Sequence, residues 1–345
     1  MGVAFKDLIT AKEISIEELG NNPLAVDAHN TLFQFLTTIR GRDGSLLMDS
    51  KGNVTSHLVG LFSRISNLMQ KSLKLIFVFD GIAPKLKQKT AEKRRELKIE
   101  AEKKYKEALE KEDAEEIKKY AARTARLTEE MIADSKKLIE CFGLPVVDAP
   151  SEGEAQASYI VKNGNAFAVV SQDYDSLIHG STKLVRNLSI VGRRKRADSL
   201  GYDVVKPEII DLAENLNNLG IDQNQLIALA MLIGTDYNPG GIKGVGPKNA
   251  LKLVKWHKTD FDALFKEVKW DDFFDFGWEE VYNLIKKIPV RDDYDIQWKG
   301  VDAERMRRLL IDERDFSEER VNSTLEKLSK QYSGKKQKGL GEFFS

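Results

Sequence analysis

Four short apolar runs, each ending in or just before aspartate, constrain the fold of this chain more than any other feature. They are "LAVD" ending at Asp27, "LIFVFD" ending at Asp80, "LPVVD" ending at Asp148 and "AFAVVSQDYD" running to Asp173 and Asp175. They alternate with helical patterns such as "NTLFQFLTTIR" and "MIADSKKLIECF". Because this alternation is typical of βαβ units, we predict an α/β fold with a mostly parallel central sheet flanked by helices.

The carboxyl ends of parallel strands share one edge of such a sheet, and ligands bind at that edge. The aspartates that end the four runs should therefore gather there. Asp173 and Asp175 are two residues apart, so in extended chain both would point to one side. The loop "TDYNPGG", after the helical stretch "QLIALAMLIG", adds Asp236. A lone aspartate is more often a cap or turn residue, but several at one edge favour a ligand site.

The segment "PSEGEAQA" follows the third run directly and brings Glu152 and Glu154 to the same edge. Side chains two apart on a regular helix do not face each other, so this pair converges only in a loop or an irregular first turn. An alternative interpretation is a capping box, in which Ser151 and Glu154 satisfy backbone amides at a helix start. That alternative explains Glu154 without chemistry and leaves Glu152 unexplained.

Seven acids are thus predicted to meet: Asp27, Asp80, Glu152, Glu154, Asp173, Asp175 and Asp236. Like charges in contact cannot all stay ionised unless cations compensate them. The sequence has no histidine or cysteine cluster, so zinc is disfavoured, and all-oxygen ligation favours Mg²⁺ or Mn²⁺. Two such ions about 4 Å apart are the usual device for attack of water on a phosphodiester. We therefore predict a nucleic-acid phosphodiesterase.

Charge is segregated along the chain, although 54 basic and 54 acidic residues give a net charge of +0. Any nucleic-acid binding must then come from local patches. Residues 85–130 are almost entirely Lys, Arg, Glu and Ala, which suits an exposed helix with many ion pairs. A solvated protrusion or a coiled-coil fragment are alternatives, and the lack of a sustained heptad disfavours the latter. Lys87 and Arg94, seven residues apart, would share a helix face.

A glycine-rich turn lies in "GIKGVGPKNALKLV", residues 241–254. Glycines let backbone amides approach phosphate closely, and Pro247 suits the first position of a helix. The pattern resembles a helix-hairpin-helix motif, over about 226–256, for sequence-independent contact with a DNA backbone. A plain turn between two helices is the alternative.

Composition favours a soluble protein of a reducing compartment. Hydrophobic residues make up 41% of the chain, no apolar run approaches the ~18 residues of a membrane span, and the start is no secretory signal. The single cysteine, Cys141, cannot form an internal disulfide. We expect a monomer that is cytoplasmic in a prokaryote or nuclear in a eukaryote.

The last thirteen residues, "SGKKQKGLGEFFS", lack a core pattern until two terminal phenylalanines. We predict a single nuclease domain over 1–332 and a flexible tail over 333–345. Exposed phenylalanines in such a tail indicate a binding partner.

Taken in order, these motifs resemble the flap endonucleases of the structure-specific 5′ nuclease superfamily, in their archaeal and eukaryotic form. The similarity runs from "MGV" to the last phenylalanine and includes "AVDAHNTLFQFL", "TSHLVGLFSR", "FVFDG", "PSEGEAQA", "SQDYDSL", "GTDYNPGGIKGVGPKNAL" and "FSEERV". It implies a PIN-like nuclease core with a helical arch at about 85–130. The implied activity is that of a flap endonuclease and 5′–3′ exonuclease, cutting branched DNA near the junction of single strand and duplex during replication and repair.

The resemblance also implies roles for individual residues. A first metal ion would be held by Asp27, Asp80, Glu152 and Glu154, and a second by Asp173, Asp175 and Asp236. Lys87 and Arg94, at the base of the arch, would polarise the scissile phosphate. DNA contacts would come from Gly2, Phe33, Arg40, Thr55, Gly244, Gly246 and Lys248, with potassium assisting the hairpin. Gln337, Leu340, Phe343 and Phe344 fit the Q-x-x-L-x-x-F-F motif that docks on a sliding clamp.

Two positions depart from the family pattern. Phe33 stands where relatives often carry a tyrosine that stacks on a base, and Ala83 where many carry a proline.

Two rival hypotheses about the function remain. An inactive clamp-binding scaffold predicts lost acids, yet all seven are present. A PIN-type ribonuclease shares the acidic edge but normally lacks the hairpin, the arch and the clamp motif.

Overall fold

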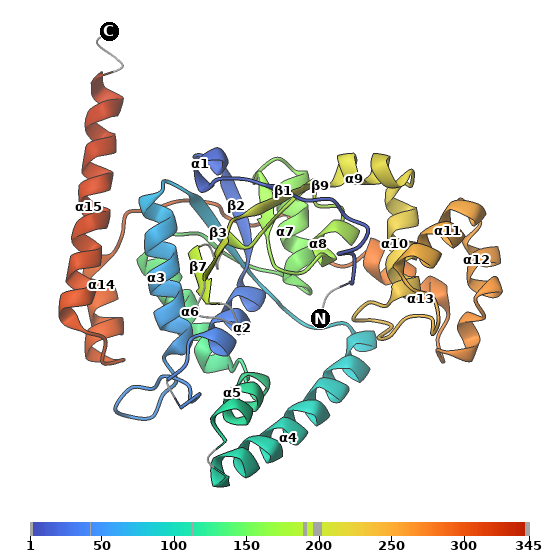
Figure 1. Ribbon diagram of the computed structural model, residues 1–345. Helices are drawn as coiled ribbons and strands as arrows, with labels where there is room; N and C mark the ends of the chain where they lie inside the picture. The colour runs from blue at the N-terminus through green and yellow to red at the C-terminus, as the bar shows by residue number, and fades with distance from the viewer. Residues whose placement is uncertain (1–2, 42, 112, 189–191, 196–201, 342–345) are drawn as a thin grey trace.

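The structure, a computed structural model, describes residues 3–41, 43–111, 113–188, 192–195 and 202–341. Its strands are β1 (Lys12–Glu13), β2 (Pro23–Asp27), β3 (Lys74–Phe79), β4 (Val146–Asp148), β5 (Ala168–Val170), β6 (Lys183–Arg186), β7 (Gly192–Lys195), β8 (Tyr202–Val205) and β9 (Glu208–Asp211). Within these residues, seven strands form one sheet in the order β1-β9-β6-β5-β2-β3-β4 (Figure 1). The strands from β6 to β4 are parallel, whereas β9 and β1 are antiparallel additions. The predicted mostly parallel sheet is confirmed.

The central strands are buried on both faces, which is why their sequences read as continuous apolar runs. In β2, Ala25 belongs to the core on one side of the sheet, while Leu24 and Val26 belong to the core on the other. In the neighbouring strand, Ile76 pairs with Ala25 and lies in the same core. Successive side chains therefore fix the sheet between two hydrophobic layers and leave only its edges for polar chemistry.

Helices cover both faces of the sheet. One core includes residues of α1 (Ile16–Leu19), α2 (Ala28–Thr38), α3 (Ser56–Gln70), α6 (Glu129–Cys141), α14 (Ala303–Arg307), the turn η4 (Arg308–Asp312) and α15 (Glu318–Gly341). The other includes residues of α7 (Gly153–Lys162), α8 (Asp175–Ile178), α9 (Leu212–Leu219), α10 (Gln223–Ile233), α11 (Pro247–His257), α12 (Phe261–Glu267), η3 (Trp270–Asp272) and α13 (Trp278–Lys286). No helix among the described residues combines the length and the apolar character that a membrane crossing needs.

The glycine-rich turn connects α10 to α11, as the sequence predicts. Gly244 has φ +88°, a left-handed conformation that glycine adopts without strain, and a Cβ there would meet open space. Gly246 is the N-cap of α11 and Pro247 its first residue. The turn is tied back by a hydrogen bond from the Ile242 amide to the Leu232 carbonyl, 2.9 Å long. Gly244, Gly246 and Lys248, around the start of α11, are exposed.

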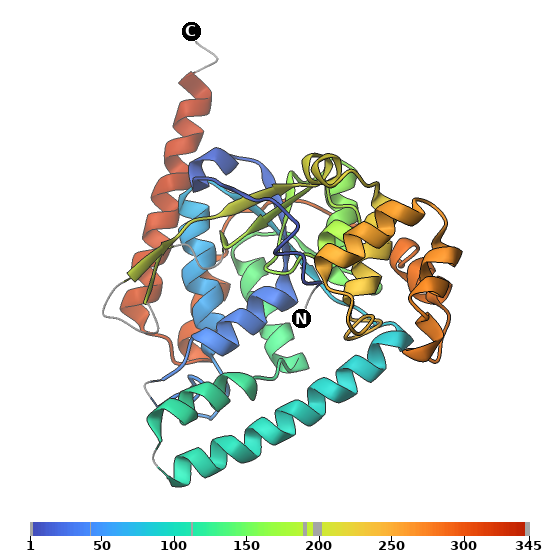
Figure 2. The ribbon, with the colours of Figure 1, turned by 45° about the vertical axis from the view of Figure 1, so that its right-hand side comes forward.

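The charged segment forms a helical protrusion of η1 (Lys85–Lys87), α4 (Gln88–Glu110) and α5 (Ala114–Arg123). Figures 1 and 2 show α4 leaving the body alone and α5 returning toward α6. Three buried alanines, Ala101, Ala108 and Ala121, lie on these two packed helices. The charged residues outside form pairs such as Lys104 with Glu100, 2.6 Å apart four residues along the helix. The predicted exposed helix is confirmed.

Two local predictions are wrong. Strand β5 ends at Val170, so Asp173 lies in a bend and Asp175 begins α8, instead of both lying in extended chain. The bend forms because the Ser171 hydroxyl accepts a hydrogen bond from the Asp173 amide, 3.3 Å long. At the other end of the chain, α15 continues to Gly341, so the backbone of residues 333–341 is helical where a flexible tail was predicted. No proline interrupts the helix after its packed first turns.

Gly81 holds the loop after β3 against the loop after β4. Its amide donates to the Ser151 carbonyl at 2.6 Å, and a Cβ would lie 2.1 Å from the Ala149 carbonyl oxygen. We predict that Gly81→Ala lowers the free energy of unfolding by about 2 kcal/mol, because two backbones must separate. Urea unfolding measures this. Gly300→Ala, whose Cβ would touch nothing within 4 Å, is the control, and equal stability of the two variants contradicts this account.

Candidate active site

A cavity of about 330 Å³ lies at the carboxyl edge of the parallel strands and gathers all seven predicted acids. The predicted basic pair, Lys87 and Arg94, lines it too. Its full lining is Asp27, His29, Asn30, Phe33, Asp80, Lys87, Arg94, Lys98, Glu152, Glu154, Asp173, Asp175 and Asp236. The sequence prediction that these side chains meet is therefore confirmed.

The first two aspartates are fixed by the helix and loop that follow their strands. Asp27 ends β2 and caps α2, accepting from the Asn30 amide at 3.0 Å and from the Ser171 hydroxyl at 3.1 Å. Asp80 follows β3 and accepts from the Gly153 amide at 2.7 Å. These neutral donors hold each carboxylate in place without cancelling its charge.

Glu152 and Glu154 lie at the start of α7, in the irregular turn that their spacing required. The alternative capping box is wrong: Glu152 is the N-cap residue, and the Ser151 hydroxyl instead donates to the Ile82 carbonyl at 3.1 Å. The side chain of Glu152 is buried and accepts a hydrogen bond from the Lys87 ammonium. The side chain of Glu154 takes no part in capping α7, so its carboxylate can serve the cavity.

The remaining acids come from two loops. Asp173 accepts from the Asn30 amide side chain at 2.8 Å, and Asp175 accepts from the Val3 backbone amide at 2.7 Å. Asp236 accepts from the Arg94 guanidinium at 2.5 Å and lies 3.5 Å from the Lys87 ammonium. Asn30 thus links the acid at the end of β2 to the acid in the loop after β5.

Burial and mutual repulsion perturb these carboxylates. Burial first, and then the charge of Asp80, raise the pKa of Asp27 to about 7. Burial likewise raises the pKa of Asp175 to about 7, with the charge of Asp173 adding to it. The pKa of Glu154 rises well above its usual value, mainly through burial and then through Asp175. The cavity therefore holds more negative charge than the folded chain alone stabilises.

Lys87 and Arg94 supply part of the missing positive charge. Burial lowers the pKa of Lys87, but Glu152 and Asp236 raise it by more, so the ammonium stays protonated. The Thr90 hydroxyl donates to the Asp236 carbonyl at 2.6 Å, which anchors the base of α4 beside the acids.

The donor set fits hard divalent cations because it consists of oxygen ligands in excess of the available positive charge. Within the described part of the chain, no three His, Cys, Asp or Glu side chains form a compact group that could hold a metal ion as they stand. This spacing is expected of repelling carboxylates, two of which are paired with Lys87 and Arg94 instead. The two-metal site remains a prediction.

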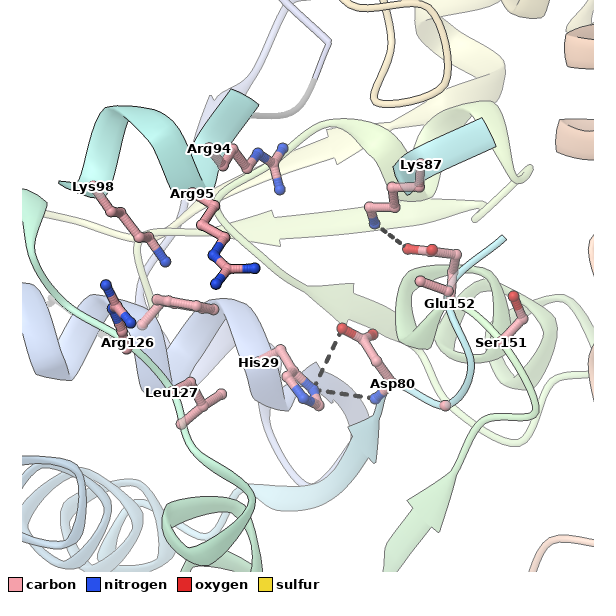
Figure 3. A pocket seen from close by; sticks show the side chains of 13 residues that line it. His29, Asp80, Lys87, Arg94, Arg95, Lys98, Arg126, Leu127, Ser151 and Glu152 are labelled. Atoms are coloured by element: carbon pink, nitrogen blue, oxygen red, sulfur yellow. Dashed lines mark hydrogen bonds and ion pairs between the residues drawn. The ribbon is translucent and has the colours of Figure 1, made fainter. Parts of the chain in front are cut away.

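A second cavity, of about 640 Å³, adjoins the acids and is basic. Figure 3 shows Arg94, Arg95, Lys98 and Arg126 around it, with Lys87 directed at Glu152. These basic side chains come from α4 and from the segment after α5. The cavity therefore leads from the acidic edge toward the inside of the arch.

The predicted DNA-contact residues that the structure describes do not gather at one place. Phe33 is 37% exposed, lines both cavities and lies under the Lys98 ammonium, 5.3 Å from the ring centre. Arg40 donates to the Gly44 carbonyl at 2.9 Å, and Thr55 is buried; neither lines the acidic cavity. Gly244, Gly246 and Lys248 are exposed on the hairpin, also outside it.

Sequence reasoning missed four residues that line or brace the acidic cavity: His29, Asn30, Thr90 and Lys98. His29 and Asn30 stand in "DAHN", immediately after a predicted acid at a helix start, and that position was the available signal. Thr90 and Lys98 follow Lys87 and Arg94 at helical spacing. Gly2, Phe343 and Phe344 lie outside the described residues, as do the side chains of Gln337 and Leu340.

Comparisons with known proteins agree with this geometry. Residues 1–101 match the XPG N-terminal domain and residues 143–236 match the XPG I-region. Flap endonuclease 1 of Pyrococcus abyssi is 50% identical over 344 residues, covering 100% of this chain and 98% of that protein. The structure of flap endonuclease-1 from Methanococcus jannaschii is 42% identical with a TM-score of 0.75, covering 97% of this chain and 100% of that one.

A more distant structure, the catalytic core of Rad2 in complex with DNA substrate, is 24% identical with a TM-score of 0.69, covering 95% of this chain and 100% of that one, and shows the shared fold alone. The sheet, the acidic edge and the two matched regions define a nuclease core of the XPG class. Within that class, the chain belongs to the flap endonuclease family, in its archaeal form.

We predict that Asp175→Asn stabilises the metal-free protein above neutral pH. The folded pKa of about 7 exceeds the ordinary 3.8, so the folded chain binds more protons between these values and loses stability as pH rises through them. In chelator, the variant should exceed wild type in free energy of unfolding by on the order of 1–2 kcal/mol at pH 8, and by less at pH 5.

Urea unfolding at both pH values measures the difference. The control is Asp148→Asn, since Asp148 lies at the same sheet edge but outside the cavity, paired with Lys136 at 2.6 Å. The predicted proton linkage is contradicted if Asp175→Asn and wild type differ in free energy of unfolding by the same amount at pH 5 and at pH 8.

Proposed function

We propose that the chain cuts flapped and branched DNA as a Mg²⁺-dependent endonuclease and 5′–3′ exonuclease, hydrolysing phosphodiesters near the junction of single strand and duplex. As a flap endonuclease, it is a structure-specific DNA nuclease of replication and repair. The observation that carries the proposed chemistry is one cavity lined by seven carboxylates together with Lys87 and Arg94. Nucleases of this family generally depend on divalent metal ions.

The proposed metal ligands fall into two sets along the acidic edge. The first is Asp27, Asp80, Glu152 and Glu154, and the second is Asp173, Asp175 and Asp236. Two Mg²⁺ ions, for which Mn²⁺ can substitute, would supply an activated water and neutralise the leaving oxygen. Asn30 donates to members of both sets and so keeps their spacing constant. Asp27 and Glu152 are buried, which strengthens the electrostatic interactions of these two carboxylates.

Lys87 and Arg94 are proposed to act on the scissile phosphate. Both are paired with carboxylates of the cavity, so the entering phosphate exchanges one anionic partner for another at each cation. Arg94 offers a planar fork to two phosphate oxygens, and Lys87 a compact charge. They stabilise negative charge that grows in the transition state.

Substrate selection is proposed to lie in the surrounding surfaces. The 5′ single strand passes beneath α4, where Arg95, Lys98 and Arg126 line the basic cavity. Phe33 stacks on a base at the cavity mouth. The hairpin at Gly244 and Gly246 offers backbone amides to the duplex, and K⁺, when bound there, would assist this contact. Gly2, Arg40, Thr55 and Lys248 are proposed to complete the contacts to DNA.

The C-terminal segment is proposed to dock on a sliding clamp through Gln337, Leu340, Phe343 and Phe344. These residues follow the Q-x-x-L-x-x-F-F pattern, which a clamp reads through two aromatic anchors and a preceding polar residue. The proposed unit is a nuclease domain over 1–332 with a docking segment over 333–345. We propose further that the chain acts as a monomer in the cytoplasm of an archaeal-type cell.

A double-flap DNA, labelled at the 5′ end, tests the proposed chemistry. Wild type should cut it with Mg²⁺ and not in chelator. Asp236→Asn should keep its affinity for the flap and lose about 100-fold or more in single-turnover rate, because an amide ligates a hard cation poorly. Asp148→Asn is the matched control and should cut like wild type. The metal mechanism is contradicted if wild type still cuts the DNA in chelator.

Removal of the residues after Lys336 tests the docking segment. The truncated chain should cut flap DNA at the wild-type rate when no clamp is present, since the proposed metal ligands and the basic pair all lie elsewhere in the chain. Stimulation by an archaeal sliding clamp should be lost. Lys338→Ala, at a variable position of the motif, should keep the stimulation. The docking assignment fails if the truncated chain is stimulated as strongly as wild type.

A further inference from the structure

We propose that His29 is an additional DNA-contacting residue of this site, donating a hydrogen bond from its Nε2–H to a phosphate oxygen of the strand bound beside Asp80. The inference rests on the proposed function, because it assumes that a DNA strand occupies the acidic cavity. Neither the predicted acids nor the predicted cations include this residue.

The hydrogen bond at the other ring nitrogen determines which nitrogen carries the proton. The Asp80 backbone amide lies 3.1 Å from His29 Nδ1 and donates to it. A backbone N–H can only donate, so Nδ1 must present its lone pair. The ring is then neutral with its proton on Nε2, as a donor facing away from Asp80. Phe79 fixes the plane of the ring by an edge-to-face contact, with centroids 5.8 Å apart.

The donor at Nε2 has no partner among the residues that the structure describes. None of the hydrogen bonds among the described residues uses it, and the side chain is 18% exposed. His29 lines both the acidic and the basic cavity, and Figure 3 shows it beside Asp80 with Arg95 and Lys98 across the pocket. A donor that opens into a cavity built for an anionic strand has phosphate oxygen as its natural acceptor.

Position along α2 supports the same assignment. His29 and Phe33 are four residues apart, so they share one face of the helix, and both line the two cavities. Phe33 offers a ring to a base, and His29 offers a donor one turn closer to the acids. A lysine at this position would pair with Asp80 and lose its availability to phosphate. A neutral N–H can contact phosphate while leaving the charge of Asp80 for a cation.

Two substitutions separate the two ring nitrogens. His29→Asn keeps an acceptor for the Asp80 amide but lacks the outer donor. His29→Gln is long enough to present an amide N–H near the Nε2 position. We expect His29→Asn to lose about tenfold or more in single-turnover cleavage of the double-flap DNA, the usual effect of one hydrogen bond to a charged group, and His29→Gln to recover most of it.

Uncharged methylphosphonate linkages, placed one at a time around the cut, locate the contact. One linkage should slow wild type and add no further loss in His29→Asn, because the donor is already gone. Thr38→Ala, at the far end of α2 and outside both cavities, is the matched control and should behave like wild type at every linkage. Urea unfolding of each variant identifies any loss that comes from misfolding.

The proposal is overturned if His29→Asn cuts as fast as wild type, because the ring would then serve only to hold the Asp80 loop. It is also overturned if His29→Gln is no faster than His29→Asn while both are as stable as wild type, or if the same linkage slows all variants equally. Failure of wild type to cut the unmodified flap DNA with Mg²⁺ is a different result, which contradicts the proposed function itself.

Discussion

Repulsion among carboxylates is the physical constraint on which the active edge of this molecule depends. The parallel sheet brings the ends of β2, β3 and β5 together, and one acid ends β2 while others follow β3 and β5. The chain offsets this cost locally with neutral donors, such as Asn30, Ser171 and the amide of Val3. Burial first, and then the charge of neighbouring acids, still raise the pKa of Asp27 and of Asp175 to about 7. Cations bound among these carboxylates would reduce their mutual repulsion.

The same constraint explains why the arch begins where it does. Lys87 lies on η1 and Arg94 on the first turns of α4, and both reach back to acids that the sheet has gathered. The Thr90 hydroxyl adds a neutral tie to the same loop. The base of the protruding helix is therefore tied to the cavity by two ion pairs and one hydrogen bond. Bound cations or a DNA strand would change this charge balance and so would alter the contacts that hold the base of the arch.

The sheet and its acidic edge were predictable because each depends on a short-range pattern. Apolar runs that end at Asp27 and Asp80 specify buried parallel strands, and strand polarity then determines where the acids lie. The course of the chain at the end of the fourth run was not predictable, since the bend at Asp173 depends on the Ser171 hydroxyl. The helical backbone near Gly341 also escaped prediction, because α15 extends from a packed beginning that the terminal residues do not reveal.

Side chains that complete the cavity were harder to find than the acids. His29 and Asn30 act through contacts with loops that lie far away in sequence, so no spacing rule identifies them. Ser151 shows the opposite error, since a local motif predicted a helix cap and the tertiary contact with the Ile82 carbonyl took its place. Sequence patterns within one segment thus predict local structure well where burial determines it. They predict it poorly where a contact with a residue distant in sequence determines it.

The claim that the seven acids form a paired metal site is tested most directly by counting bound ions. Titration of the metal-free protein with Mn²⁺, followed by electron paramagnetic resonance, reports both their number and their separation. The account predicts two Mn²⁺ ions per chain with the spin coupling of neighbours about 4 Å apart, and a single uncoupled ion in Asp236→Asn. Wild-type protein that binds one ion, or two ions without coupling, would contradict it.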